Sequence, residues 1–236
     1  MAALQQAVGS GPQQVVSIRL AATAAPAADP YGEPSSTAAP APESAVSGEA
    51  LRMLQGENPD FVGWLRLPGT QVDYPVVQSP DRPQYYLRRD FSKKRSTGGT
   101  PFIDERCDLG GNRGNLIVYG HNMKNGSLFG ELKKLLDPAF YEAHRTITFD
   151  TPEGPGTYRV AAVSLVRVDP AAAFQFYWYP NLTTEADFDR YTAGIVSDSA
   201  HPQDMDLFFG DELLTLATCS KHVEDGRLLV VGKRIQ

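Results

Sequence analysis

The sequence has few of the features that mark several large classes of protein. It holds only 2 cysteines in 236 residues, too few for a disulfide-rich scaffold, and their spacing does not suit a structural zinc site. A single disulfide between the two stays open at this stage. With 22 Lys and Arg against 28 Asp and Glu, the formal net charge is -6, whereas a nucleic-acid-binding protein normally presents a basic surface. Internal repeats are also absent.

Long apolar runs are missing as well. No stretch approaches the roughly 18 apolar residues of a membrane-spanning helix. The N-terminus lacks the basic start and continuous apolar segment of a secretory signal peptide. What the chain does have is material for one core, because 42% of its residues are hydrophobic and they include 11 Phe and 10 Tyr. This length and composition favour a single sizeable domain.

Two regions of different composition divide the chain. Residues 21–46 are rich in Ala, Pro, Ser and Thr and contain almost no large apolar side chains. Such a segment cannot bury enough surface to offset the conformational entropy lost on ordering. We therefore predict a disordered tether over residues 1–46 and a compact domain over residues 47–236.

The compact region alternates short β-rich segments with clusters of Gly, Pro and Asn, which is typical of an all-β sandwich or barrel. Helices interrupt this pattern, and the last of them begins with the capping pair Thr184 and Asp187. The predicted helices are 48–57, 127–136 and 183–197. The predicted strands are 64–67, 72–77, 100–104, 115–119, 146–150, 157–168, 212–219 and 227–235.

The last two predicted strands place a cysteine beside an arginine. Period-2 alternation puts Cys219 on the face opposite Leu214 and Leu216, and the connection 220–226 returns the chain so that Arg227 lies next to the thiol. A guanidinium favours the nucleophilic thiolate. It also donates hydrogen bonds to an oxyanion, a contribution of about 3 kcal/mol. On the strands alone, a structural cysteine beside a surface arginine is the favoured interpretation.

Arginine is too basic to act as a general base, so such a site needs another group for proton transfer. His121 follows an apolar strand and one glycine, which would hold it on a rigid element while leaving it exposed. His222 is the second candidate, in the loop after the cysteine. His144 is expected to cap a helix, and His201 has no special setting in a polar loop. Cys107 is the weaker nucleophile candidate because acidic residues flank it.

Two motifs in these segments resemble those of a known family. Residues 215–219 (TLATC) followed by Arg227 resemble the sortase signature TLxTC…R, and residues 119–123 (YGHNM) resemble the sortase histidine motif. Both occur in the family order. Further segments between residues 50 and 236 are similar to class B sortases in particular: 58–65, 72–78, 85–87 and 102–104.

The resemblance implies a mainly β fold: a closed eight-stranded barrel with an N-terminal helix and a long helix between late strands. It also implies a cysteine transpeptidase that needs no cofactor and no metal. Such an enzyme cleaves a C-terminal sorting signal after Thr through a Cys thioester. It then transfers the acyl group to an amine of a cell-wall precursor or to a pilin lysine. By matching position, Cys219 is the nucleophile, His121 the general acid and base, Arg227 the oxyanion or substrate anchor, and Tyr119, Thr218 and Ala217 the lining of the substrate groove.

Family members act on surface proteins or pilins, at the extracellular face of the membrane, usually from an N-terminal anchor that this chain does not show. The tether would then be the remnant of a membrane stalk. Ala217 stands where many class B members have serine, and Ser220 where an acidic residue is common, which leaves the sorting motif open.

Two alternatives stay open. One is an L,D-transpeptidase-like enzyme, although its Ser-His-Gly-Cys pattern is absent, and the other is a non-catalytic cell-surface module with a sortase-like barrel.

Overall fold

The computed structural model describes residues 46–110, 114–169, 171–202 and 206–236, and the structural statements below concern these residues. The predicted tether lies outside them except for Val46. The backbone N–H of Val46 donates a hydrogen bond to Asp150 Oδ2 at 3.1 Å. In the described part of the chain no helix is both long enough and apolar enough to cross a membrane.

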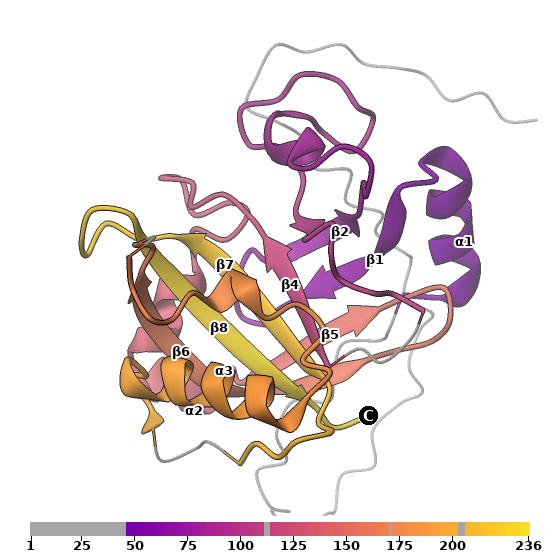
Figure 1. Ribbon diagram of the computed structural model, residues 1–236. Coiled ribbons are helices and arrows are strands. Elements are labelled where there is room, and N and C mark those ends of the chain that lie inside the picture. The colour runs from indigo at the N-terminus through magenta and orange to yellow at the C-terminus, as the bar shows by residue number, and fades with distance from the viewer. Residues whose placement is uncertain (1–45, 111–113, 170, 203–205) are drawn as a thin grey trace, which may run out of the picture. The chain divides into compact units, whose positions relative to one another are not determined.

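Eight strands close into a barrel in the order β1-β2-β3-β4-β7-β8-β6-β5 (Figure 1), which confirms the predicted fold class. Each strand has a neighbour on both sides, although the two-residue strand β3 pairs with only the ends of β2 and β4. The predicted strands all exist, most within a few residues of their expected bounds. They are β1 Phe61–Arg66, β2 Asp73–Val77, β3 Phe102–Ile103, β4 Asn115–Tyr119, β5 Thr146–Asp150, β6 Thr157–Arg167, β7 Leu213–Cys219 and β8 Gly226–Arg234.

Helices α1 (Gly48–Glu57) and α3 (Glu185–Ser197) confirm two of the three predicted helices. Thr184 is the N-cap of α3, and its hydroxyl oxygen accepts a hydrogen bond from the backbone N–H of Asp187, as the capping pair predicts. The described residues also form the 3₁₀ helices η1 Tyr85–Arg88, η2 Leu132–Leu136 and η3 Phe176–Trp178 and the α-helix α2 Pro138–Ala143.

The helix predicted over residues 127–136 is wrong for its first half. Leu128 has a φ of 55°, in the left-handed region, and the Phe129 N–H donates to the carbonyl of His121 instead of to a helical partner. Only the last part is helical, as η2. A separate helix, α2, follows it, with Asp137 as the N-cap and Pro138 in the first turn.

The core is centred on the parallel pair β4 and β7, whose residues are nearly all buried. Leu214 and Leu216 are fully buried, and on the opposite face of β7 the Thr215 hydroxyl lies 2.5 Å from the Tyr191 hydroxyl of α3. Figure 1 shows α3 lying along the barrel wall that contains β6, β8 and β7. Both faces of β7 are therefore covered, and exposure begins only at its last residue, Cys219.

Candidate active site

Cys219 ends β7 at the rim of the barrel. Its antiparallel partner in β8 is Arg227, as the alternation and loop length predict. The thiol is free and exposed, and the arginine is half-buried. The sequence therefore predicted this pair correctly, down to the residue in register.

The positive charge of the Arg227 guanidinium is not neutralised by a carboxylate among the described residues. Nη1 donates to the backbone carbonyl of Gly226 at 2.9 Å. Within the described residues, no Asp or Glu forms an ion pair with Arg227, although Glu224 and Asp225 lie in the preceding loop. A charged donor without a protein counter-ion, beside an exposed thiol, is suited to bind an oxyanion or a substrate carbonyl.

The parallel pairing of β4 with β7 brings His121 to the same end of the barrel. Tyr119 lies opposite Ala217, so the next two residues of each chain reach His121 and Cys219. Gly120 lies between Tyr119 and His121. Its lack of a side chain lets the Phe129 ring pack closely against the backbone, because a Cβ there would lie 2.6 Å from that ring. The Gly120 carbonyl also accepts a hydrogen bond from the Thr218 hydroxyl at 2.7 Å.

The imidazole of His121 is oriented by a backbone group. Its Nε2 lies 2.9 Å from the carbonyl oxygen of Leu87 in η1. Since a carbonyl only accepts hydrogen bonds, Nε2 carries a proton and, in the neutral ring, Nδ1 is the free base. Among the described residues, no hydrogen bond joins His121 to the thiol. The residue after His121 joins the two segments instead, because Asn122 Nδ2 donates a hydrogen bond to the backbone carbonyl of Cys219 at 2.8 Å.

The three predicted groove residues differ in exposure. Tyr119 is half-buried, with its ring 5.5 Å from Phe102 and 6.4 Å from Phe176. Ala217 and Thr218 are buried, at 2% and 3% exposure. Thr218 serves the fold by bonding the Gly120 carbonyl. Contact of Tyr119, Ala217 and Thr218 with a substrate stays a prediction.

Cys107 contrasts with Cys219. It is free, which removes the disulfide left open by the sequence, and it is 5% exposed. Burial raises the pKa of the Cys107 thiol to about 12, although the Ile117 N–H donates to the sulfur at 3.4 Å. Cys107 is thus the weaker nucleophile as predicted, with burial as the main cause and the neighbouring acids as a lesser one.

The other three histidines have separate settings. His144 caps α2 as predicted and stacks on Phe140. The prediction of no special setting for His201 is wrong: it is 3% exposed, stacks on Tyr141 and hydrogen-bonds a carbonyl of η2. Exposed His222 lies in the β7–β8 connection, where its Nδ1 is 2.9 Å from the Ser220 hydroxyl.

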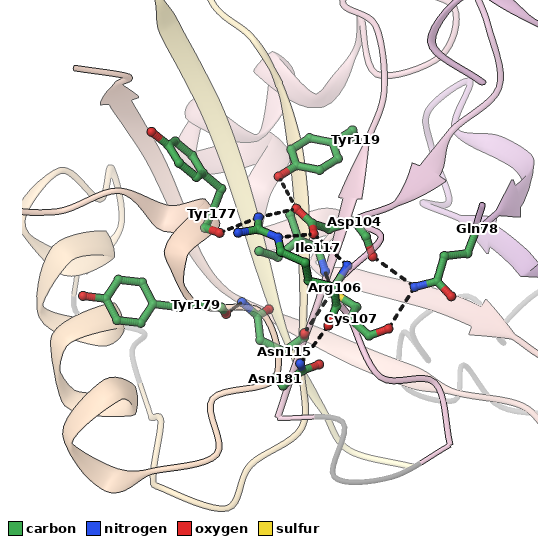
Figure 2. Close-up of polar contacts among 10 residues, drawn as sticks. All are labelled: Gln78, Asp104, Arg106, Cys107, Asn115, Ile117, Tyr119, Tyr177, Tyr179 and Asn181. Carbon is green, nitrogen blue, oxygen red and sulfur yellow. Dashed lines mark hydrogen bonds and ion pairs between the residues drawn. The ribbon is translucent and has the colours of Figure 1, made fainter. Parts of the chain in front are cut away.

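Sequence reasoning missed the supporting groups of this site. Leu87 acts through its carbonyl, Asn122 through its side-chain amide and Asp104 through a buried network. Leu87 and Asp104 lie in the segments 85–87 and 102–104 that resemble class B sortases, but the resemblance did not indicate these roles. Asn122 had one signal, its place directly after His121 in the YGHNM motif. The Asp104 network is drawn in Figure 2.

The closed barrel carries an exposed cysteine at a strand end, an arginine opposite it that forms no ion pair among the described residues, and a histidine just after the adjacent strand, an arrangement suited to acyl transfer through a cysteine. A family model described as a sortase domain matches residues 65–235. Sortase B of Listeria monocytogenes is 34% identical over 195 residues, which cover 80% of this chain and 77% of the relative.

Solved structures agree with this match. The Clostridium perfringens sortase B structure has a TM-score of 0.70 at 30% identity and covers 78% of this chain and 99% of that one. The Staphylococcus aureus sortase B–substrate complex has a TM-score of 0.70 at 29% identity, covering 80% and 85%. The chain belongs to the sortase family, in its class B, and it is a cysteine transpeptidase. The L,D-transpeptidase and non-catalytic alternatives are thereby set aside.

Proposed function

We propose that this transpeptidase cleaves a C-terminal sorting signal of surface proteins after Thr and transfers the acyl group to an amine, with Cys219 as nucleophile. The acceptor is an amine of a cell-wall precursor or a pilin lysine. The observation that carries the proposal is the exposed thiol of Cys219 in register with Arg227, whose charge has no carboxylate partner among the described residues. Sortases are associated with the cell surface, and we place this enzyme at the extracellular face of the membrane, held by an N-terminal anchor.

The first half-reaction forms a thioester. The Cys219 thiolate attacks the Thr carbonyl carbon, and the oxygen takes the electron pair while Arg227 donates hydrogen bonds to it. The carbon–nitrogen bond then breaks, and His121, which enters the reaction as the imidazolium, gives the proton on its Nδ1 to the departing amine and becomes neutral. The acyl group is left on Cys219 and the C-terminal fragment leaves.

The second half-reaction runs in the opposite sense. The acceptor amine attacks the thioester carbonyl while His121 removes its proton, and the carbon–sulfur bond breaks to return the thiolate. Each residue is used in both halves, so the site needs no oxidant, reductant or second nucleophile. Tyr119, Ala217 and Thr218 are proposed to line the groove that receives the sorting signal.

The test compares Cys219→Ala, His121→Ala and Arg227→Ala on sorting-signal peptides with an amine acceptor. Mass spectrometry should show the acyl-enzyme on the unchanged protein and none on Cys219→Ala. Transfer should fall by about 10²- to 10⁴-fold without His121. It should fall by about 10²- to 10³-fold without Arg227.

Cys107→Ala and His222→Ala are the matched controls, and both should keep nearly full transfer. Unchanged turnover in Cys219→Ala, or a loss in His222→Ala equal to that in His121→Ala, contradicts the assignment of that residue. A peptide library with varied sorting motifs identifies the sequence that is cleaved.

A further inference from the structure

A buried carboxylate lies behind the proposed groove. The Asp104 side chain is 4% exposed and follows β3. It accepts four hydrogen bonds: Arg106 Nε and Nη2 at 2.8 Å each, the Arg106 backbone N–H at 3.1 Å, and the Tyr119 hydroxyl at 2.9 Å. Figure 2 shows Asp104 between Tyr119 and Arg106. Burial alone would raise the pKa of Asp104, but these donors outweigh it and hold the pKa below its ordinary value.

On one side this network fixes Tyr119. The tyrosine is in register with Ala217, and the next residue of β7 on that face is Cys219. The Tyr119 ring also packs against Phe176 of η3. A peptide that reaches the sulfur along this face of the sheet must pass the Tyr119 ring, so its position determines the shape of the surface next to the thiol.

On the other side the network holds the connection from β6 to α3. Arg106 Nη2 donates to the carbonyl of Tyr177 at 2.7 Å, and Asn181 Nδ2 donates to the carbonyl of Arg106 at 2.9 Å. The side-chain oxygen of Asn181 accepts from the Asp108 N–H at 2.7 Å. Arg106 thus joins Asp104 to the loop that carries Phe176, and Figure 2 shows Arg106 with Asp104, Tyr177 and Asn181.

We infer that Asp104 and Arg106 are positioning residues for the acyl donor: they fix Tyr119 and the η3 loop in one arrangement beside Cys219. The inference rests on the proposed function. Asp104 is buried but the Arg106 side chain is 47% exposed. Such a half-exposed ion pair adds little net stability, whereas its two parallel hydrogen bonds demand one geometry. Its contribution is therefore expected in recognition of the sorting signal. Neither residue contacts the thiol, the histidine or Arg227.

The experiment measures steady-state kinetics with a sorting-signal peptide and an amine acceptor. In Arg106→Gln and Asp104→Asn, KM for the peptide should rise about tenfold, with kcat within about twofold and KM for the amine unchanged. Tyr119→Phe, which removes only the hydroxyl, should raise the peptide KM about threefold. The double variant Asp104→Asn/Arg106→Gln should be no worse than the worse single variant, because the two side chains act as a unit.

Arg234→Gln is the matched control. It breaks another arginine–carboxylate pair, with Glu212 at 2.7 Å, near the far end of β8. Its kinetics should be unchanged. Thiol titration counts one reactive thiol in a folded molecule and two in an unfolded one, because Cys107 is buried only in the fold, and so it gives the fraction of folded enzyme. Misfolding lowers the apparent kcat and leaves KM unchanged.

An unchanged peptide KM in all three network variants, or an equal rise in Arg234→Gln, overturns the inference while leaving the proposed function intact. If the unchanged protein shows no turnover, the proposed function fails on its own. The positioning role is then read from the Kd of the peptide for Cys219→Ala with and without Arg106→Gln, where an equal Kd refutes it.

Discussion

At the scale of single residues, the two cysteines differ by their access to water. Cys219 is exposed, while burial raises the pKa of Cys107 to about 12. Near pH 8, only about one Cys107 thiol in 10⁴ would be ionised, and thiolate is the form that alkylating reagents attack.

Iodoacetamide at pH 8 should therefore add one label per folded molecule, on Cys219, and a second label on Cys107 only in urea. Peptide mass spectrometry after digestion reads both sites. Cys219→Ser serves as the control and should take no label while folded. Rapid labelling of Cys107 in the folded protein would contradict its burial.

The residues of the site were predictable to different degrees. Strand alternation and loop length sufficed for Cys219 and Arg227, because both depend on a local hairpin. His121 needed its motif, since its place beside the thiol comes from a parallel pairing of strands far apart in the sequence. The roles of Asp104 and Asn122 were not predicted, because the Tyr119 hydroxyl and the Cys219 carbonyl reach them only through the fold of the barrel, although Arg106, the other partner of Asp104, is local.

At the scale of elements, the site depends on how the ends of β4 and β7 are joined. The Thr218 hydroxyl bonds the Gly120 carbonyl, and the Asn122 amide bonds the Cys219 carbonyl. These two hydrogen bonds hold the loop with His121 against the strand with the thiol, although no direct bond links the two side chains in the described residues.

Asn122→Ala should consequently lower kcat by about threefold to tenfold with little change in thermal stability, because one neutral exposed hydrogen bond contributes about 0.5–1.5 kcal/mol. Transfer assays and a thermal melt measure the two effects. Asn125→Ala is the matched control, since Asn125 bonds Ser127 within the same loop and does not contact β7. An equal loss of kcat in both variants would show that the loop as a whole, and not this bond, matters.

The elements show where periodicity fails as a guide. Helices α1 and α3 follow their caps and breakers, which are local signals. The segment at 127–136 has a helical pattern of apolar residues, yet the His121 carbonyl takes the Phe129 N–H and Leu128 turns left-handed. The tertiary contacts that hold the His121 loop therefore outweigh the local preference for a helix in this segment.

At the scale of the whole molecule, two carboxylates that accept several hydrogen bonds predict the response to acid. Asp60 and Asp104 are both affected by burial, which raises a carboxyl pKa, but hydrogen bonds from Tyr86, Lys93 and Arg106 outweigh it and leave both pKa values lowered. A carboxyl with a lowered pKa in the folded state stabilises the fold above its unfolded pKa. That contribution is lost as the pH falls through the folded pKa.

The urea midpoint should thus fall as the pH drops from about 5 to 2, below the ordinary Asp pKa of about 3.9. Asp104→Asn should flatten this dependence, because one of the carboxyl groups with a lowered pKa no longer titrates. Asp73→Asn is the control, since Asp73 is exposed in its ion pair with Arg66. A steeper acid dependence in Asp104→Asn would contradict the direction of its pKa shift.

The direction of the strands has one more consequence. Val46 meets the barrel at Asp150, and the last residue, Gln236, donates its backbone N–H to Thr157. Because β8 runs antiparallel to β7, and β5 and β6 continue that ladder, both contacts lie at the end away from Cys219. A bead, a dye or a fused protein attached at either position would hold the barrel by the end opposite Cys219. The Cys219 thiol would then face away from the attachment, so that a large substrate protein and a bulky amine acceptor could both reach it.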